Sequence, residues 1–155
     1  VRSAANVGNI LRTCEAAHIM QVCLCGSMTP SPPHNRQLLK TAMGAAEYVP
    51  FSTYSSTLAC MQELKQKGVT VVGVETTSNS TDLYRTNMPQ PCALVFGNEL
   101  VGIHPQVMKH CDGLVCIPTR GVKNSLNVAS CASIVMYEVL RQWNVAASDN
   151  DGLSE

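Results

Sequence analysis

The chain has 155 residues, of which 45% are hydrophobic and 14% are charged. This length fits one domain, and the hydrophobic share is enough for a buried core, which excludes a disordered chain. The formal net charge is zero, with 11 basic and 11 acidic residues. This balance neither requires nor excludes a nucleic-acid partner. No apolar run approaches the roughly 20 residues of a membrane span, so we expect no membrane segment.

Helices and strands alternate in the first half of the chain. Spacing of apolar residues predicts the elements, and three prolines make residues 27–33 a loop. The expected elements are helices over 6–17, 35–46 and 57–66, and strands over 19–25, 48–51 and 69–74. Gly68 is expected just beyond the end of the third helix.

The second half continues the alternation. The expected elements are strands over 92–96 and 114–117, and helices over 105–110 and 126–143. Such alternation predicts an α/β domain on a mostly parallel sheet flanked by helices. We expect this domain to cover residues 1–147, followed by a flexible tail over 148–155.

Eight cysteines raise the question of disulfides or a metal. Most lie in apolar stretches, where cysteine behaves as a small hydrophobic residue, so buried free thiols are favoured over a disulfide framework. No cysteine pair has a histidine at zinc-ligand spacing, so no metal site is expected.

Ligands of parallel α/β sheets bind beyond the carboxyl ends of the strands. Three strand ends, at 74–76, 96–99 and 117–119, lead into small or polar loops and are expected to frame one pocket. In the loop GNELVG over 97–102, Glu99 would lie at the pocket mouth, or on an ordinary solvated turn. This loop fits neither a P-loop nor the dinucleotide-binding glycine pattern.

Polar residues before the last helix have an ordinary interpretation as well as a functional one. Ser125 is expected to cap this helix, with Asn127 one or two residues into its first turn. Arg120 and Lys123 lie in a polar loop and could be solvated charges or ligand-binding groups.

The first helix contains unusual residues. Asn6 can cap it, and Gly8 indicates close approach of another backbone or a ligand, since glycine costs about 1 kcal/mol inside a helix. Arg12, near the same face, could bind a phosphate or stabilise an oxyanion. Alternatively, Arg12 pairs with Glu15 on the helix surface.

Three stretches in order carry a resemblance. They are NVGNILRT over 6–13, GNELVG over 97–102 and IPTRGVKNSLNV over 117–128. They resemble the three motifs of the SpoU/TrmH family of the SPOUT superfamily of RNA methyltransferases, and the likeness extends to about Arg141. It implies an α/β fold with a deep C-terminal trefoil knot, which general fold rules make rare. It also implies a strand before Asn6 that is absent or cut short, and so further residues before Val1.

The resemblance implies an S-adenosylmethionine-dependent enzyme, without a metal, that methylates a ribose 2′-hydroxyl of tRNA or rRNA. A guanosine of the tRNA D-loop is the first expectation. The cofactor-binding residues that it implies are Thr76, Gly97, Gly102, Ile117 and Leu126. Arg12 takes the role of stabilising the developing alkoxide. The remaining polar residues implied for the active site, acting by positioning and hydrogen bonding, are Asn6, Glu99, Ser125 and Asn127.

Partners and location follow from the same resemblance. It implies a homodimer in which Arg12 acts near the partner's pocket, with the helix over 126–143 as a candidate interface. RNA is expected to bind Arg12, Arg120 and Lys123, with further candidates at Arg2, Arg36 and Lys40. An intracellular, cytoplasmic location is expected unless a targeting peptide precedes Val1.

Two alternatives stay open. One is a catalytically inactive knotted RNA-binding module, which has no need of Arg12, Glu99, Ser125 and Asn127 together. The other is a nucleotide-dependent oxidoreductase of ordinary α/β topology, but the chain lacks its glycine pattern.

Overall fold

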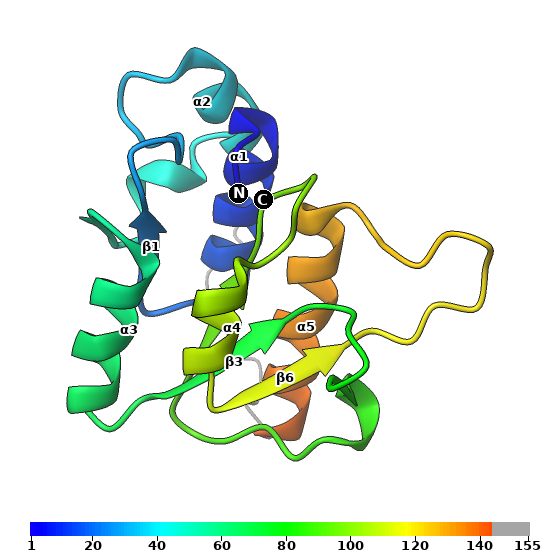
Figure 1. Cartoon of the computed structure of the whole chain (residues 1–155). Helices are drawn as coiled ribbons and strands as arrows, with labels where there is room; N and C mark the ends of the chain where they lie inside the picture. Colours follow the sequence, from blue (N-terminus) through cyan, green and yellow to red (C-terminus); the bar gives the residue numbers. More distant parts are fainter. Residues whose placement is uncertain (144–155) are drawn as a thin grey trace.

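Parallel strands alternate with helices in the computed structural model, which describes residues 1–143 (Figure 1). The elements are α1 (Ala4–Ala16), β1 (Val22–Cys25), α2 (Arg36–Ala42), η1 (Ala45–Glu47), β2 (Phe51–Tyr54), α3 (Thr57–Gln66), β3 (Thr70–Val74), β4 (Thr81–Asp82), η2 (Leu83–Arg85), β5 (Cys92–Phe96), α4 (Pro105–His110), β6 (Gly113–Cys116) and α5 (Val128–Gln142). The tail predicted over 148–155 lies outside the described residues.

Every pair of neighbouring strands in the described part of the chain is parallel. Four strands form one sheet in the order β4-β6-β3-β5, and β1 pairs with β2 in a second sheet. In the larger sheet Val72 of β3 lies opposite Leu94 of β5 and Gly113 of β6. The predicted α/β fold with parallel strands flanked by helices is confirmed. The trefoil knot stays a prediction.

Several predicted boundaries are wrong by a few residues. The helix expected over 35–46 ends at Ala42, because Met43 and Gly44 both take left-handed conformations, with φ of 53° and 87°. The strand expected over 48–51 lies at Phe51–Tyr54 instead, after Pro50. No element was predicted between the strands over 69–74 and 92–96, but β4 and η2 lie there, at Thr81–Asp82 and Leu83–Arg85. A two-residue strand carries too short a pattern for sequence periodicity to reveal.

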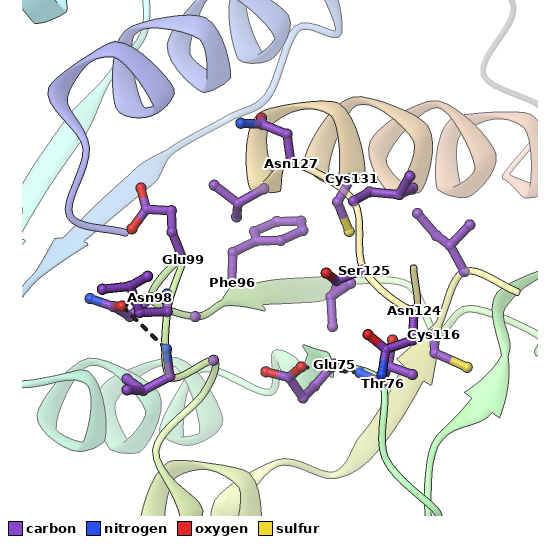
Figure 2. Close-up of a pocket in the computed structure, with 18 of the residues that line it drawn as sticks. Glu75, Thr76, Phe96, Asn98, Glu99, Cys116, Asn124, Ser125, Asn127 and Cys131 are labelled. Atoms are coloured by element: carbon purple, nitrogen blue, oxygen red, sulfur yellow. Dashed lines mark hydrogen bonds between the residues drawn. The ribbon is translucent and has the colours of Figure 1, made fainter. Parts of the chain in front are cut away.

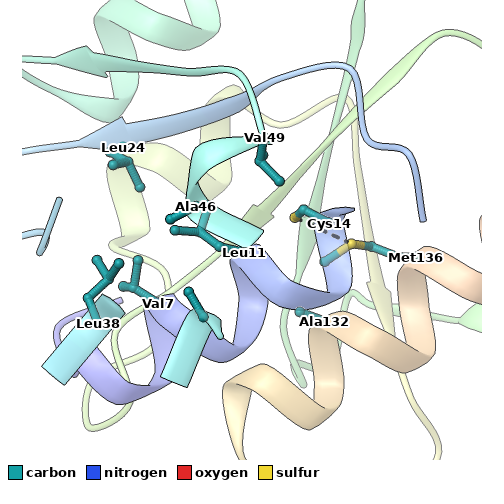
Figure 3. Close-up of a cluster of buried hydrophobic side chains, with 10 residues drawn as sticks. Val7, Leu11, Cys14, Leu24, Leu38, Ala46, Val49, Ala132 and Met136 are labelled. Carbon is teal, nitrogen blue, oxygen red and sulfur yellow. Dashed lines mark hydrogen bonds between the residues drawn. The ribbon is translucent and has the colours of Figure 1, made fainter. Parts of the chain in front are cut away.

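The first core lies between α1, α2 and α5 (Figure 3). Leu11 and Leu38 are almost fully buried there, and Cys14 of α1 contacts Met136 of α5. Gly8 is the reason that α1 and α2 can pack this closely, because a Cβ atom at Gly8 would collide with the backbone carbonyl of Leu38. The predicted close approach is confirmed, and the approaching segment is the backbone of α2.

The second core lies between the four-stranded sheet and α5. Val72 and Val115 of the sheet pack with Val135 of α5, which is completely buried. Trp143, just after α5, donates its indole N–H to the carbonyl of Met88 at 3.2 Å. Helix α5 therefore joins α1 on one side to the sheet on the other, and its position fixes where the strand ends lie relative to α1.

The cysteines are all free thiols. This confirms free thiols over a disulfide framework, but only Cys14 and Cys60 are buried, and the other cysteines are half-buried. Among residues 1–143, none of the helices has the length and apolar character needed to cross a membrane.

Candidate functional site

A pocket lies at the carboxyl ends of β3, β5 and β6 (Figure 2). The three strand ends that the sequence singled out do meet there, because parallel strands place their carboxyl ends at one edge of the sheet. The lining residues are 74–76, 96–102, 116–117, 119, 124–128 and Cys131. The prediction of one pocket framed by these ends is confirmed.

The predicted site residues divide into a group that lines this pocket and a group that does not. The pocket brings together Thr76, Gly97, Glu99, Gly102, Ile117, Ser125, Leu126 and Asn127. None of the other four, Asn6, Arg12, Arg120 and Lys123, belongs to the lining. The individual roles of both groups stay predictions.

The loop from Gly97 to Gly102 is a tight turn built by its own backbone. Asn98 and Gly102 exchange two backbone hydrogen bonds of 3.0 and 2.8 Å, and the Asn98 side chain accepts the Leu100 N–H at 2.9 Å. A side chain at Gly97 would run into the backbone of Gly102 and Ile103. Glycine is therefore required where the loop crosses over itself at the pocket wall.

Glu75 is a pocket residue that the sequence reasoning did not select. One carboxylate oxygen accepts the Ile103 N–H at 2.8 Å, and the other accepts the Thr76 N–H at 3.1 Å. Gly102 has φ of 68°, and a Cβ atom there would overlap this carboxylate. The available signal was an acidic residue directly after the most buried strand.

Hydrogen bonds join the three motifs at the rim of the pocket. Asn6 donates its side-chain amide to Glu99 at 2.9 Å, and its side-chain carbonyl accepts from the Asn127 amide at 3.1 Å. Glu99 also accepts the backbone N–H groups of Arg2 and Ser3, each at 2.9 Å. Asn6 is therefore outside the pocket lining but holds two residues that line it.

Electrostatics of Glu99 decide what it can do. Desolvation acts to raise its pKa, but hydrogen bonds from the Asn6 side chain and from the Ser3 and Arg2 backbone outweigh this and lower the pKa of Glu99 to about 2. A carboxylate this acidic is a weak base at neutral pH. Glu99 is thus suited to holding the start of α1 and the pocket rim rather than to accepting a substrate proton.

Helix α5 begins in a different way from the one expected. Asn127 is its N-cap, and its side-chain oxygen accepts the N–H groups of Ala129 at 2.9 Å and Ser130 at 3.4 Å. The prediction that Ser125 caps this helix is wrong. Serine and asparagine are about equally good caps, so sequence preference could not choose between them. Ser125 is left free of the helix and lines the pocket.

The cationic candidates point to solvent. Arg12 is exposed on α1, and its side chain forms no hydrogen bond or ion pair with residues 1–143, so the alternative pairing with Glu15 is wrong. Arg120 and Lys123 are exposed in the loop between β6 and α5, which projects from the side of the sheet (Figure 1). All three are free to contact a second molecule.

No group of three or more His, Cys, Asp or Glu side chains in the described part of the chain is arranged to hold a metal ion. The polar groups that the pocket offers are instead backbone atoms at strand ends, hydroxyls and amides, and two carboxylates. This donor set suits an organic ligand with several hydrogen-bonding groups.

Comparison with known proteins identifies the family of this chain. The model of the SpoU rRNA methylase family matches residues 1–137. The chain belongs to this family. It is 37% identical over 137 residues to the 23S rRNA (guanosine-2′-O-)-methyltransferase RlmB of Neisseria meningitidis, covering 88% of this chain and 54% of that protein. The chain therefore spans about half the length of such curated relatives.

Solved structures share the fold. The AdoMet-bound rRNA methyltransferase from Sinorhizobium meliloti superimposes with a TM-score of 0.82 at 28% identity, covering 90% of this chain and 52% of that one. The TrmH/SpoU tRNA modifying enzyme of A. aeolicus has a TM-score of 0.83 at 26% identity, covering 94% and 72%. These proteins place the described fold among SpoU/TrmH SPOUT methyltransferases.

Proposed function

We propose that this chain is the catalytic domain of an S-adenosylmethionine-dependent methyltransferase that acts on a ribose 2′-hydroxyl of tRNA or rRNA. The observation that carries the proposal is the convergence of three motifs, far apart in the sequence, on one pocket whose rim they join by hydrogen bonds. Family membership supplies the class of reaction, and the S. meliloti relative is an AdoMet-bound rRNA methyltransferase.

The pocket lining fits this cofactor. Apolar side chains of the lining, among them Phe96, Ile117 and Leu126, can flank an adenine ring. Gly97 and Gly102 line the pocket without side chains, and Thr76 adds a hydroxyl. Thr76, Gly97, Gly102, Ile117 and Leu126 are accordingly assigned to cofactor binding. No metal takes part in the proposal.

The chain has to position and activate a hydroxyl group. When bound, S-adenosylmethionine supplies an electrophilic methyl group on a positively charged sulfur. Arg12 stabilises negative charge on the 2′-oxygen as its proton leaves, because a guanidinium donates hydrogen bonds and is always charged. Asn6, Glu99 and Asn127 hold the pocket rim, and Ser125 hydrogen-bonds the reactants in line.

A homodimer completes the site in this proposal. Arg12 does not line the pocket of its own chain, and it lies about 9 Å along α1 from Asn6. On the neighbouring helix α5, the large hydrophobic residues Ile134 and Tyr137 are exposed, whereas Val135, Met136 and Val139 are buried. Two chains that meet on α1 and α5 would place Arg12 of one against the pocket of the other and cover these apolar side chains.

The RNA is assigned by class. Arg12, Arg120 and Lys123 are exposed cations near the site and are proposed to contact phosphates, with Arg2, Arg36 and Lys40 extending the surface. The relatives named above include a 23S rRNA guanosine methyltransferase and a tRNA modifying enzyme. A guanosine of rRNA and the D-loop guanosine of tRNA are therefore the first positions to examine. Such a substrate corresponds to an intracellular, cytoplasmic location.

The test is transfer of labelled methyl groups from S-adenosylmethionine to total tRNA and, separately, to rRNA, followed by nuclease mapping. Label on one ribose 2′-oxygen supports the proposal and identifies the substrate. Arg12→Ala is expected to lower transfer at least 100-fold while the affinity for S-adenosylhomocysteine stays within about twofold. Arg85→Ala, at another exposed arginine, is the matched control and should leave transfer unchanged.

The outcomes separate the alternatives. RNA binding and cofactor binding without transfer to either RNA would favour the inactive binding module over the enzyme. Full transfer by the Arg12→Ala variant would show that the role given to Arg12 is wrong. Light-scattering mass of the purified chain tests the homodimer, and a monomer that is fully active would refute it.

A further inference from the structure

Charges are distributed unevenly around the pocket. The residues that line it include two carboxylates, Glu75 and Glu99, and none of the described lining residues is a lysine, an arginine or a histidine. The net charge of the lining is therefore negative, although the chain as a whole is neutral. A pocket of this kind favours a cationic ligand over a neutral ligand of the same shape.

The two carboxylates differ in what they can do for a ligand. Glu99 is turned toward the start of α1 (Figure 2) and takes three hydrogen bonds, from Arg2, Ser3 and Asn6. Glu75 lies at the end of β3, beside Thr76 (Figure 2), and lines the pocket together with Ser125. Each of its oxygens accepts one backbone N–H, from Ile103 or Thr76, which leaves lone pairs on both.

No cationic side chain neutralises Glu75 within residues 1–143. The N–H donors fix its orientation but carry no net charge. Its field reaches other lining groups: burial is the main cause that raises the pKa of Cys131 to about 11, and the negative charge of Glu75 adds to this. The carboxylate is half-buried, so water screens it only in part.

We propose that Glu75 is a specificity-determining residue, whose fixed negative charge makes the pocket prefer the sulfonium of S-adenosylmethionine to the neutral thioether of S-adenosylhomocysteine. This proposal rests on the proposed function. In methyl transfer the S–CH₃ bond breaks and its electron pair stays on sulfur, while the 2′-oxygen forms the new O–CH₃ bond and gives its proton to solvent water. The cofactor thus loses one positive charge, and with it the attraction to Glu75, so the product is released more readily.

The contribution of the Glu75 charge can be measured by comparing a ligand that is charged on sulfur with one that is neutral there. At an effective dielectric constant of about 20, two unit charges several ångströms apart change a binding equilibrium by about tenfold or more. Removing the charge of Glu75 should therefore weaken S-adenosylmethionine binding by about tenfold. The affinity for S-adenosylhomocysteine should change less than about threefold, because this ligand has no charge on sulfur.

The experiment is calorimetric titration of the purified chain with both ligands. The wild type, Glu75→Gln and Glu63→Gln are compared, since Glu63 is a half-buried glutamate outside the pocket that pairs with Lys67. We divide the Kd of S-adenosylhomocysteine by the Kd of S-adenosylmethionine. This ratio is expected to fall about tenfold in Glu75→Gln and to stay unchanged in Glu63→Gln. Sinefungin, which carries an amine in place of the sulfonium, should follow S-adenosylmethionine.

Each outcome has one meaning. If Glu75→Gln weakens both ligands equally, Glu75 only shapes the pocket, and this proposal is refuted while the proposed function stands. If the wild type binds neither ligand, the proposed function fails as well. If Glu75→Gln does not fold, the wild type decides: raising the salt concentration from 50 to about 500 mM should weaken S-adenosylmethionine more than S-adenosylhomocysteine. Equal salt dependence would overturn the proposal.

Discussion

Asn127 connects the start of α5 to the first motif, so replacing it with alanine tests the pocket rim directly. Its side-chain oxygen caps α5 through the N–H groups of Ala129 and Ser130, and its amide donates to Asn6 at 3.1 Å. Asn127→Ala removes both interactions and leaves the α5 N–H groups without a protein acceptor.

The expected cost follows from these two interactions. Loss of an N-cap destabilises a protein by about 1 kcal/mol, and loss of a side-chain hydrogen bond by about 1 kcal/mol more. We therefore expect the free energy of unfolding to fall by about 2 kcal/mol. For a chain of this size the melting temperature should fall by roughly 4–8 °C.

Urea denaturation followed by circular dichroism measures the change, with the transition midpoint shifted and the slope unaltered. Asn127→Ser is the matched control, because serine caps a helix as well as asparagine but is too short to reach Asn6. This variant should lose about 1 kcal/mol. The reasoning would be refuted if Asn127→Ala unfolded at the same urea concentration as the wild type, or if Asn127→Ser cost as much as Asn127→Ala.

Two further predictions concern stability. Helix propensity alone favours Gly8→Ala by about 1 kcal/mol, but the new Cβ atom would collide with the Leu38 carbonyl. We therefore expect the free energy of unfolding, measured by urea denaturation, to fall by about 1–3 kcal/mol. A stabilised variant would contradict this packing. Hydrogen bonds from Arg141 and then Gln142 lower the pKa of Glu138 from 4.5 to about 2, as also found for Glu99. Between about pH 4.5 and 2 the unfolded chain therefore binds more protons than the folded chain, so the melting temperature should fall as the pH drops through this range. The fall should be smaller in Glu138→Gln. A melting temperature that does not change with pH would be inconsistent with these pKa shifts.

The position of the pocket could be predicted because it depends on topology. Alternating strands and helices indicate a parallel sheet, and the sheet fixes where its strand ends meet. The polar loops after residues 74, 96 and 117 then had to lie together. Gly8 was equally informative, since a glycine inside a helix indicates close packing. Only the structure shows that the backbone of α2 is what lies against it.

Other features depend on contacts that local patterns do not encode. Serine and asparagine cap helices about equally well, so the sequence could not choose between Ser125 and Asn127. The structure shows that Asn127 is the cap and that its amide also donates to Asn6. In the sequence, Glu75 is an ordinary polar residue after a strand. Only the structure shows that its carboxylate accepts the Ile103 N–H at 2.8 Å. Likewise, the sequence around Arg12 does not determine whether its side chain acts on the pocket of its own chain or on that of another chain.

The hydrogen bonds at the pocket rim have a consequence for the order of folding. Asn6 is 93 residues from Glu99 and 121 residues from Asn127 along the chain. Contacts between such distant residues close large loops and form late. The rim is complete only once α5, the last described helix, has packed between α1 and the sheet. A nascent chain that has not yet produced α5 therefore lacks the rim, and ligand binding reports that the whole domain has folded.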